Sequence, residues 1–208
     1  MWRYCSPTTF CSAYGDSGLA GISSPFGSVG VLPYALQKVV GEQYLHMFTR
    51  LYGLETVSIR YFNVFGPRQD PSSPYSGVIS VFATALLENR SPNIYGDGEQ
   101  TRDFTYVANV VDGVLRACEA PGASGEVINV ATGGRISLND LFKEMKKIVG
   151  AGAEPTYAEP RQGDVRDSQA DIRKARELLG YQPTVSFEEG LKRTIEWYRT
   201  THSVVPTV

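Results

Sequence analysis

The chain has 208 residues, with 20 Lys and Arg against 22 Asp and Glu, which gives a formal net charge of −2 at pH 7. This near-neutral balance has no electrostatic footprint for nucleic acid or an anionic membrane, so neither is predicted as a partner. Hydrophobic residues at 42% and aromatic residues at 11% are enough for a packed core, which excludes general disorder.

Signals for targeting and for cysteine chemistry are weak. No apolar run approaches the ~18 residues of a membrane-spanning helix, and residues 1–9 lack the apolar segment of a signal peptide. The three cysteines, Cys5, Cys11 and Cys118, are odd in number and widely spaced, which favours neither a disulfide framework nor a metal site. We therefore expect a soluble enzyme or binding domain of a reducing compartment, the cytoplasm, without a bound metal.

The first half of the chain is predicted to contain one long helix and one strand. Residues 1–33 are rich in Gly, Ser and Pro and show no clear period, so they are predicted to be irregular. Apolar residues recur at helical spacing over Tyr34–Tyr52, and Gly53 is a typical C-terminal stop. The segment Glu55–Val64 is dense in β-branched and aromatic residues and precedes a Gly-Pro pair, which predicts a strand.

The second half alternates helices with short strands. Helices are predicted near 78–89, from about 107 to 120, from a Ser137 cap to Gly150, near 171–179 and over 187–198. The run Glu126–Ala131 is almost wholly apolar, as in a strand buried on both faces. The tail 202–208 is expected to fray. This alternation predicts an α/β architecture with a mostly parallel sheet.

Tyr34 and Lys38 are the first pair of residues that could carry chemistry. They stand four residues apart on the predicted helix, so their side chains share one face. A phenol ionises near pH ~10, and a neighbouring ammonium favours the phenolate, which makes tyrosine a usable general base or acid near neutral pH. The alternative, an ordinary Tyr and Lys on a helix surface, stays open because this spacing is common by chance.

Several motifs in register resemble one family. The segments Leu32–Lys38, Ser58–Pro71 (SIRYFNVFGPRQDP) and Ile94–Phe104 (IYGDGEQTRDF) are similar in order and spacing to the extended short-chain dehydrogenase/reductases, the NAD-dependent nucleotide-sugar epimerases and dehydratases. The resemblance covers about Ala13 to Trp197, and its RQDP and RQGDVRDSQAD segments look most like UDP-N-acetylglucosamine and UDP-glucose 4-epimerases. It implies NAD as cofactor and a partial Rossmann-like, doubly wound parallel sheet with a small C-terminal α/β substrate-binding domain.

The resemblance also implies catalytic and cofactor-binding roles. Tyr34 matches the tyrosine that exchanges a proton with the sugar 4-hydroxyl. Lys38 matches the lysine that holds the nicotinamide ribose and lowers the pKa of that tyrosine. Both would contact the cofactor, together with Phe62, which matches a position beside the nicotinamide.

Substrate-binding roles follow from the same resemblance. The positions that match the family's UDP-sugar site are Asn63, Gly77, Val78, Asn93, Ile94, Tyr95, Arg102, Arg161, Asp164 and Ser168. Arg102 and Arg161 match arginines on the diphosphate, for which a multi-donor guanidinium is apt. Asn93–Tyr95 match the segment that holds the uracil, and Asp164 matches a ribose contact.

Ser168 bears on the choice of sugar. In the family its position lies against the sugar, where a bulky aromatic residue excludes an N-acetyl group and a small residue admits it. Serine therefore favours N-acetylated sugars, as well as or instead of plain hexoses. Simpler interpretations stay open: Ser168 on a solvated turn, Arg102 in a surface pair with Asp103, and Phe62 and Val78 as plain core.

The nucleotide-binding front end of the family is not recognised here. Gly15, Gly18 and Gly21 spell GxxGxxG, but no apolar strand precedes them, and Tyr14–Asp16 instead matches the family's YGD upstream of the catalytic tyrosine. We therefore expect a chance match of the glycines. The chain is expected to correspond to the C-terminal two-thirds of an epimerase, truncated or frameshifted at its start.

The catalytic hydroxyl is a second departure from the family. The Ser or Thr that normally contacts the sugar 4-hydroxyl falls on Phe10, whose ring donates no hydrogen bond. Either a local shift brings Thr9 or Ser12 into place, and Ser12 is our candidate, or the function is impaired. Cys11, Ser12 and Ala13 supply no carboxylate, which disfavours the family's dehydration and decarboxylation reactions.

The sequence thus predicts an NAD-dependent epimerase that interconverts UDP-N-acetylglucosamine and UDP-N-acetylgalactosamine, or UDP-glucose and UDP-galactose, through a 4-keto intermediate. Residues 1–75 are assigned to the remainder of the NAD-binding domain, 76–200 to the substrate-binding region with returns to the sheet near 103–131, and 201–208 to a tail. The resemblance implies a homodimer through the helix 34–52. Alternatives are another sugar-nucleotide modifier, such as a reductase or dehydratase, or a non-catalytic UDP-sugar-binding or dimerisation remnant.

Overall fold

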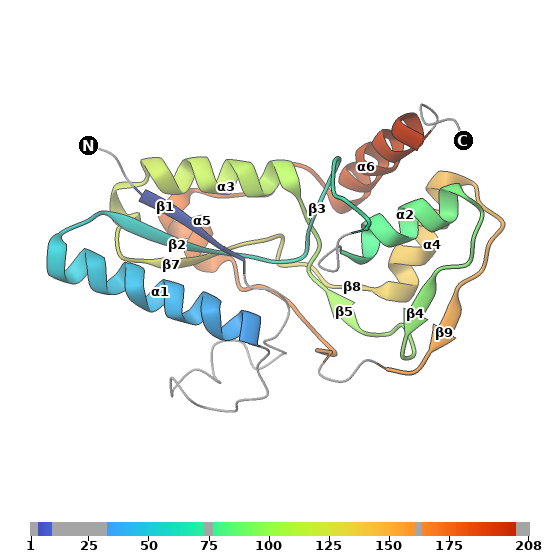
Figure 1. The fold of residues 1–208 in the computed structure, drawn as a ribbon. Coiled ribbons are helices and arrows are strands. Elements are labelled where there is room, and N and C mark those ends of the chain that lie inside the picture. Colours follow the sequence, from blue (N-terminus) through green and yellow to red (C-terminus); the bar gives the residue numbers. More distant parts are fainter. Residues whose placement is uncertain (1–3, 10–32, 73–76, 161–163, 203–208) are drawn as a thin grey trace.

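A three-stranded parallel sheet, with the strand order β1-β2-β7, is the main sheet of the molecule. The computed structural model describes residues 4–9, 33–72, 77–160 and 164–202. The three strands are Tyr4–Thr9, Thr56–Tyr61 and Val127–Val130. Helix α1 (Pro33–Tyr52) covers one face of the sheet, and α3 (Val107–Glu119) covers the other (Figure 1). This mixed α/β fold with a parallel sheet confirms the predicted fold class.

Strand β1 lies within the segment that the sequence analysis predicts to be irregular. It pairs with β2 in register, from Tyr4 opposite Thr56 to Thr9 opposite Tyr61. Its sequence, YCSPTT, lacks a clean alternation of apolar and polar residues and so carries no strand signal. Pro7 is tolerated because β1 is an outer strand of the described sheet. Pairing with β2, rather than local sequence, therefore specifies this strand.

The predicted strand 55–64 is interrupted near its carboxyl end. β2 stops at Tyr61, and Asn63 adopts a positive φ of 26°, a region that asparagine enters more readily than most residues. The chain then forms β3 (Val64–Phe65), which pairs in parallel with β6 (Thr105–Tyr106) outside the main sheet. The turn at Asn63 directs the chain away from the sheet and leaves this residue at the sheet's edge.

The core of the sheet region joins β2 and β7 to α3 and α5 (Arg173–Leu179). In β7, Ile128 and Val130 are fully buried, whereas Val127 and Asn129 are half-buried. The expectation of a strand buried on both faces is therefore wrong. β7 alternates because it is the other outer strand of the described sheet, so its second face is only partly covered.

The second region consists of three helices and two pairs of short strands (Figure 1). The helices are α2 (Val78–Leu87), α4 (Leu138–Val149) and α6 (Phe187–His202). The strands are β4 (Asn93–Tyr95), parallel to β9 (Thr156–Ala158), and β5 (Thr101–Arg102), antiparallel to β8 (Ile136–Ser137). The three helices enclose a core in which the rings of Phe82 and Phe142 meet edge to face, with centroids 6.0 Å apart.

The ends of two helices test the predicted boundaries. The Ser137 hydroxyl accepts a hydrogen bond from the Asp140 backbone N–H at 3.0 Å, which confirms the predicted cap of α4. Gly150, with a φ of 77°, ends α4 in the left-handed conformation that glycine adopts freely. Helix α6 runs past the predicted end at Tyr198 to His202.

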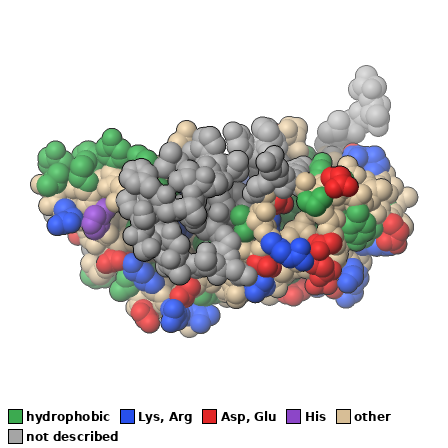
Figure 2. All heavy atoms as spheres, turned by 90° about the horizontal axis from the view of Figure 1, so that it is seen from below, with side chains coloured by type: hydrophobic (Ala, Val, Ile, Leu, Met, Phe, Trp, Pro, Cys, Tyr) green, Lys and Arg blue, Asp and Glu red, His purple; other side chains and the backbone are tan. Residues whose placement is uncertain are grey.

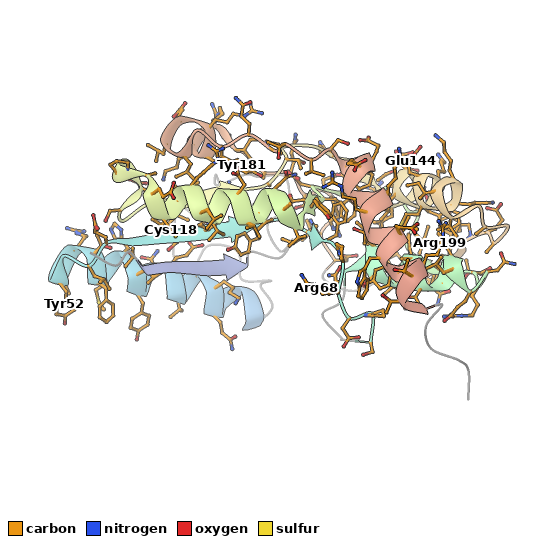
Figure 3. The ribbon with its side chains drawn as sticks, turned by 90° about the horizontal axis from the view of Figure 1, so that it is seen from above. Tyr52, Arg68, Cys118, Glu144, Tyr181 and Arg199 are labelled. Carbon is orange, nitrogen blue, oxygen red and sulfur yellow. The ribbon has the colours of Figure 1, made fainter. Side chains whose placement is uncertain are left out.

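Helix α1 carries an exposed apolar face. Its members, between 39% and 70% exposed, are Val40, Tyr44, Met47, Phe48, Leu51 and Tyr52. Figure 2 shows hydrophobic side chains gathered at the left end of the molecule, and Figure 3 shows Tyr52 pointing away from the sheet. None of the helices in the described ranges is both long and apolar enough to cross a membrane.

Candidate functional site

The carboxyl ends of the parallel strands form the first half of the candidate site. The register places Thr9, Tyr61 and Val130 side by side at this edge, where open α/β sheets bind their ligands. Asn63 follows β2 here, and its side-chain Nδ2 is buried with no hydrogen-bond partner among the described residues. Phe62 is half-buried against a small apolar cluster behind the edge. A polar ligand with a hydrogen-bond acceptor at this edge would satisfy the unpaired donor of Asn63.

The predicted catalytic residues are described only in part. Tyr34 and Lys38 lie in the first two turns of α1, four residues apart as expected, and Lys38 is half-buried. The position of the Tyr34 side chain is not described. Ser12 and Arg161 lie outside the described residues, as do Phe10 and the glycines of the GxxGxxG match. The roles of these residues stay predictions.

A buried ion pair anchors α1 to the sheet, and sequence reasoning missed it. Arg60 of β2 donates from Nε and Nη2 to the two carboxylate oxygens of Glu42, at 2.8 and 2.7 Å. Glu42 is only 2% exposed and stands one turn after Lys38 on the same helix face. The pair therefore fixes the rotation of α1, and with it the face that carries Tyr34 and Lys38. The sequence shows that Glu42 shares a helix face with Tyr34, but it shows neither the burial of Glu42 nor its pairing with Arg60.

Arg102 is a buried cation at the centre of the second half of the site. Its side chain is 8% exposed, and Nη2 donates to Asp164 Oδ1 at 2.7 Å. Nη1 donates to the carbonyl oxygens of Thr101, at 2.8 Å, and of Arg166, at 3.1 Å. The interpretation of Arg102 as a surface partner of Asp103 is therefore wrong. Because a guanidinium has five N–H groups, Nε–H and one Nη2–H have no partner in the described part of the chain.

Asp103 has different hydrogen-bond partners from those of Arg102. The sequence analysis did not identify it as a residue that shapes the site. Its carboxylate is fully buried and accepts bonds from the Thr132 hydroxyl at 2.6 Å and the Thr132 N–H at 3.1 Å. It also accepts bonds from the N–H groups of Gly133 at 2.8 Å and Ala170 at 3.3 Å. Burial raises the pKa of Asp103, while these hydrogen bonds oppose that rise. Asp103 thus ties the loop after β7 to the segment that carries Asp164.

Ser168 lies in the same layer and is completely buried. Its N–H donates to the Thr101 carbonyl at 3.1 Å, beside a bridge between Thr101 and Asp167. Its hydroxyl oxygen has no partner among the described residues, and its exposure is 0%. The interpretation of Ser168 as part of a solvated turn is therefore wrong. Like Asn63, it is a buried polar group that lacks a partner.

Two clefts open beside these residues and share Tyr95. The larger, of about 570 Å³, is lined by Tyr95, Gly96, Asp97, Gln100, Tyr157, Ala158, Glu159, Pro160, Asp164, Val165 and Arg166. The smaller, of about 320 Å³, is lined by Pro71, Val81, Thr84, Ala85, Arg90, Ser91, Pro92, Asn93 and Tyr95. Across the larger cleft, Arg166 and Asp97 form an ion pair at 3.2 Å. Arg102 lines neither cleft, but Asp164 and Arg166, which accept its hydrogen bonds, line the larger one.

The remaining predicted residues flank the clefts in different ways. Ile94 is 1% exposed and belongs to the core of the second region, so its side chain does not face either cleft. Gly77 is the N-cap of α2 without a side-chain cap, and Val78, its first residue, packs half-buried against the core. A Cβ on Gly77 would lie 3.2 Å from the amide nitrogen of Gln69, so a side chain there would crowd this turn.

The described residues fit one end of a dinucleotide cofactor. Phe62 directly follows β2 at the carboxyl edge of the sheet and precedes Asn63 with its unpaired amide, and Lys38 lies in the second turn of α1. Such a place suits the nicotinamide end. β2 leads into β3 and β7 into β8, and the segment that follows β1 lies outside the described residues. Among the described elements, the fit is thus to the nicotinamide end rather than to the pyrophosphate, which a glycine-rich turn before a helix would receive.

Comparison with known proteins gives a consistent match. The model of the NAD dependent epimerase/dehydratase family matches residues 4–131. The chain is also 45% identical over 167 residues to the UDP-glucose 4-epimerase of Mycolicibacterium smegmatis. That alignment covers 80% of this chain and 53% of the relative, so the chain spans about half the length of the curated relatives it matches.

Two solved structures share the fold. The UDP-glucose 4-epimerase of Thermotoga maritima, with UDP-glucose, superposes with a TM-score of 0.82 at 39% identity, over 97% of this chain and 65% of that chain. The UDP-N-acetylglucosamine 4-epimerase of Methanobrevibacter ruminantium, in complex with UDP-N-acetylmuramic acid, gives 0.84 at 38% identity, over 95% of this chain and 63% of that chain.

Proposed function

Because this chain belongs to the NAD-dependent epimerase/dehydratase family, we propose that it binds a UDP-sugar and acts in its epimerisation at C4. The observation that carries the proposal is Arg102, a buried guanidinium that has N–H groups to spare among the described residues and is paired with Asp164, a residue that lines the larger cleft. A diphosphate is the ligand that such a cation recognises best. Arg161 is proposed as its companion on the diphosphate, and Asp164 as the ribose contact.

The side of β4 that faces away from β9 supports uracil as the base. β4 bonds to β9 through alternate residues, since the Thr156 N–H donates to the Pro92 carbonyl and the Gly96 N–H to the Ala158 carbonyl. The backbone groups of Asn93 and Tyr95 therefore face the opposite edge. On that side the Asn93 carbonyl matches the N3–H donor of uracil, while the Tyr95 carbonyl already accepts a hydrogen bond from Gln100 Nε2 at 2.6 Å. Uracil would thus be held by backbone atoms, with Ile94 anchoring the strand in the core.

The proposed chemistry belongs to α1. The Tyr34 phenol takes the proton from the 4-hydroxyl oxygen of the sugar and later returns it, and the Lys38 ammonium favours the phenolate that this requires. Ser12 is proposed as the hydroxyl that completes the contact to the sugar. When NAD is bound, it supplies the hydride acceptor for C4. Glu42 and Arg60 hold the helix that presents Tyr34 and Lys38.

The sugar and the assembly are proposed on separate grounds. Ser168 is small and completely buried, and we propose that a small residue at this position admits an N-acetylated hexose as well as plain glucose or galactose. The exposed apolar face of α1 supports the homodimer expected through this helix. The cytoplasm is the proposed compartment.

A second candidate function is a UDP-sugar-binding protein without catalysis. It is favoured by the contrast between the described groups around Arg102 and the larger cleft, and the cofactor fit, which the described residues support at the nicotinamide end.

Calorimetry with the full chain tests the proposal. We expect UDP to bind, and Arg102→Met to weaken it about 10- to 100-fold because hydrogen bonds from a charged donor are lost. Arg116→Met, which removes an exposed arginine of α3 paired with Asp112, is the matched control and should bind UDP like the parent chain. Absence of UDP binding would contradict the proposal. Binding of NAD⁺ in the same series favours the epimerase, and UDP binding without NAD⁺ binding favours the second candidate.

A further inference from the structure

Asn139, in the first turn of α4, holds a turn of the chain that forms part of the wall of the larger cleft. Its backbone N–H donates to the Gly98 carbonyl at 3.0 Å. Its side-chain Nδ2 donates to the Asp97 carbonyl at 3.1 Å and to Glu99 Oε1 at 2.6 Å. Asn139 itself lines neither cleft, whereas Asp97 lines the larger one. Three consecutive residues of this turn are thus bonded to a single asparagine.

The same side chain also holds a second part of that wall, on β9. The Tyr157 hydroxyl donates to Asn139 Oδ1 at 3.0 Å. Tyr157 lines the larger cleft and is 57% exposed, so this hydrogen bond restricts a side chain that packing alone would not fix. Both hydrogens of the Asn139 amide and its oxygen are then in use. Asn139 therefore connects the turn 96–99 to β9 from outside the cleft.

The close fit of Asn139 against this turn requires a glycine at position 98. A Cβ on Gly98 would lie 2.1 Å from Asn139 Oδ1, which leaves no space for a side chain. Gly98 also has a φ of 77°, a left-handed conformation that glycine adopts without steric cost. Both features let the turn lie directly on the start of α4.

The turn 96–99 is also connected to the residues around the buried guanidinium of Arg102. Arg166 Nη2 donates to Asp97 Oδ2 at 3.2 Å, and the Arg166 carbonyl accepts from Arg102 Nη1 at 3.1 Å. Arg166 thus contacts both the turn that Asn139 holds and the cation that is proposed to bind the diphosphate.

We propose that Asn139 is a positioning residue for nucleotide binding, because it holds the turn 96–99 and Tyr157 in place before the ligand enters. Neither the motif match nor the proposed reaction gives Asn139 a role, and the inference rests on the proposed binding of a UDP-sugar. Without Asn139, both parts of the wall would have to be ordered as the ligand binds, which reduces affinity. Asn139 is half-buried and the side chains that it bonds, those of Glu99 and Tyr157, are exposed, so its loss should affect stability less than affinity.

Two measurements on the full chain test the proposal. Hydrogen exchange of the Glu99 amide, whose N–H donates to Asp97 Oδ1 at 3.0 Å, reports the order of the turn without any ligand. Asn139→Ala should speed this exchange and weaken UDP binding in calorimetry about three- to tenfold, the equivalent of ordering about one side chain. Its thermal midpoint should stay within about 3 °C of that of the parent chain. Asn129→Ala is the matched control: Asn129 Nδ2 also donates to a backbone carbonyl, that of Asp171 at 3.0 Å, and Asn129 lines neither cleft.

A charge-based rescue separates positioning from general loosening. Asn139→Asp keeps the acceptor for Tyr157 but places a carboxylate against that of Glu99, so it should weaken UDP binding at least as much as Asn139→Ala. Adding Glu99→Gln replaces this repulsion by a hydrogen bond of reversed direction, from the glutamine amide to the aspartate, and should recover most of the affinity. Glu99→Gln alone should bind UDP like the parent chain.

The inference is overturned if Asn139→Ala binds UDP as tightly as the parent chain, whether or not exchange of the Glu99 amide rises. It is also overturned if UDP binding weakens while that exchange is unchanged, or if the double variant binds as weakly as Asn139→Asp. A parent chain that binds no UDP instead overturns the proposed function on which the inference rests.

Discussion

The sheet region and the second region, called the helical region from here on, differ in how completely they bury their apolar residues. In the helical region, α2, α4 and α6 close on a core of their own, and Val81 is the one large apolar residue of these three helices that is more than 36% exposed among those described. In the sheet region, α1 exposes the face described above, and α3 exposes Val107, Val111 and Leu115 at four-residue intervals. A stripe at this spacing is one continuous helix face. The helical region thus buries its own apolar residues, whereas the sheet region leaves apolar helix faces exposed among the described residues.

The helical core should give the largest loss of stability. Phe82→Ala removes a fully buried ring from the contact with Phe142 and should lower the free energy of unfolding by about 3–5 kcal/mol. Val111→Ala on the exposed stripe of α3 is the control from the other region, with an expected change below about 0.5 kcal/mol. Urea denaturation measures both. Equal losses would remove the contrast between the regions.

The hydrogen bonds of Asp103, which link the helical region to the sheet region, should give the second-largest loss of stability. Asp103→Ala leaves the N–H groups of Thr132, Gly133 and Ala170 without their acceptor, and we expect a loss of about 2–3 kcal/mol. Asp103→Asn keeps one carbonyl acceptor and should lose less. Thermal unfolding of the three proteins gives the order, and an alanine variant as stable as the parent would show that the carboxylate does not hold the two regions together.

The exposed face of α1 should respond in association rather than in stability. Leu51→Glu places a charge on a residue that is 67% exposed, so the free energy of unfolding should change by less than about 0.5 kcal/mol. In sedimentation velocity the same variant should be monomeric where the parent chain self-associates. Val81→Glu on α2 is the matched change in the helical region and should leave association as it is. A monomeric parent chain would contradict the proposed homodimer.

The smallest expected effect is the pH response of Asp171 in the sheet region. Hydrogen bonds from the Arg173 side chain lower the pKa of Asp171 to about 2 from its usual 3.8. Its folded-state pKa is depressed, so the stability it contributes is present above about pH 3.8 and is lost as the pH falls toward 2. The pair is largely exposed, which limits the effect to below about 0.5 kcal/mol. Acid titration of Asp171→Asn should be flatter over this range than that of the parent chain.

The sequence predicted what periodicity and local chemistry encode. The helical spacing over 34–52 located α1, and the Ser137 cap located the start of α4. Strand β1 was not predicted, because Tyr4–Thr9 has no strand pattern and depends on pairing with β2. The break after β2 was not predicted, because the positive φ of Asn63 cannot be recognised within a run of β-branched and aromatic residues.

The candidate site was predictable where motif and geometry coincide. Arg102 and Asp164 stand far apart in the sequence, and the resemblance alone placed them in one site, where the structure joins them by an ion pair. Glu42 and Asn139 were not found, because their importance lies in the partners that the fold brings to them. Local sequence carries no record of either. The roles of Tyr34 and Ser12 stay predictions, since the described side chains include neither.

The carboxylate of Asp103 has a further consequence for hydrogen exchange. The amide hydrogens of Thr132, Gly133 and Ala170 come from segments well separated in the chain, yet all three bond to this one side chain. None of these amides can exchange from the native state unless its hydrogen bond to the Asp103 carboxylate breaks. Their protection from exchange therefore reports a shared opening of the loop after β7 and the segment beside Ser168. A ligand held by the adjacent Arg102 would stabilise the closed form and slow exchange at all three amides together.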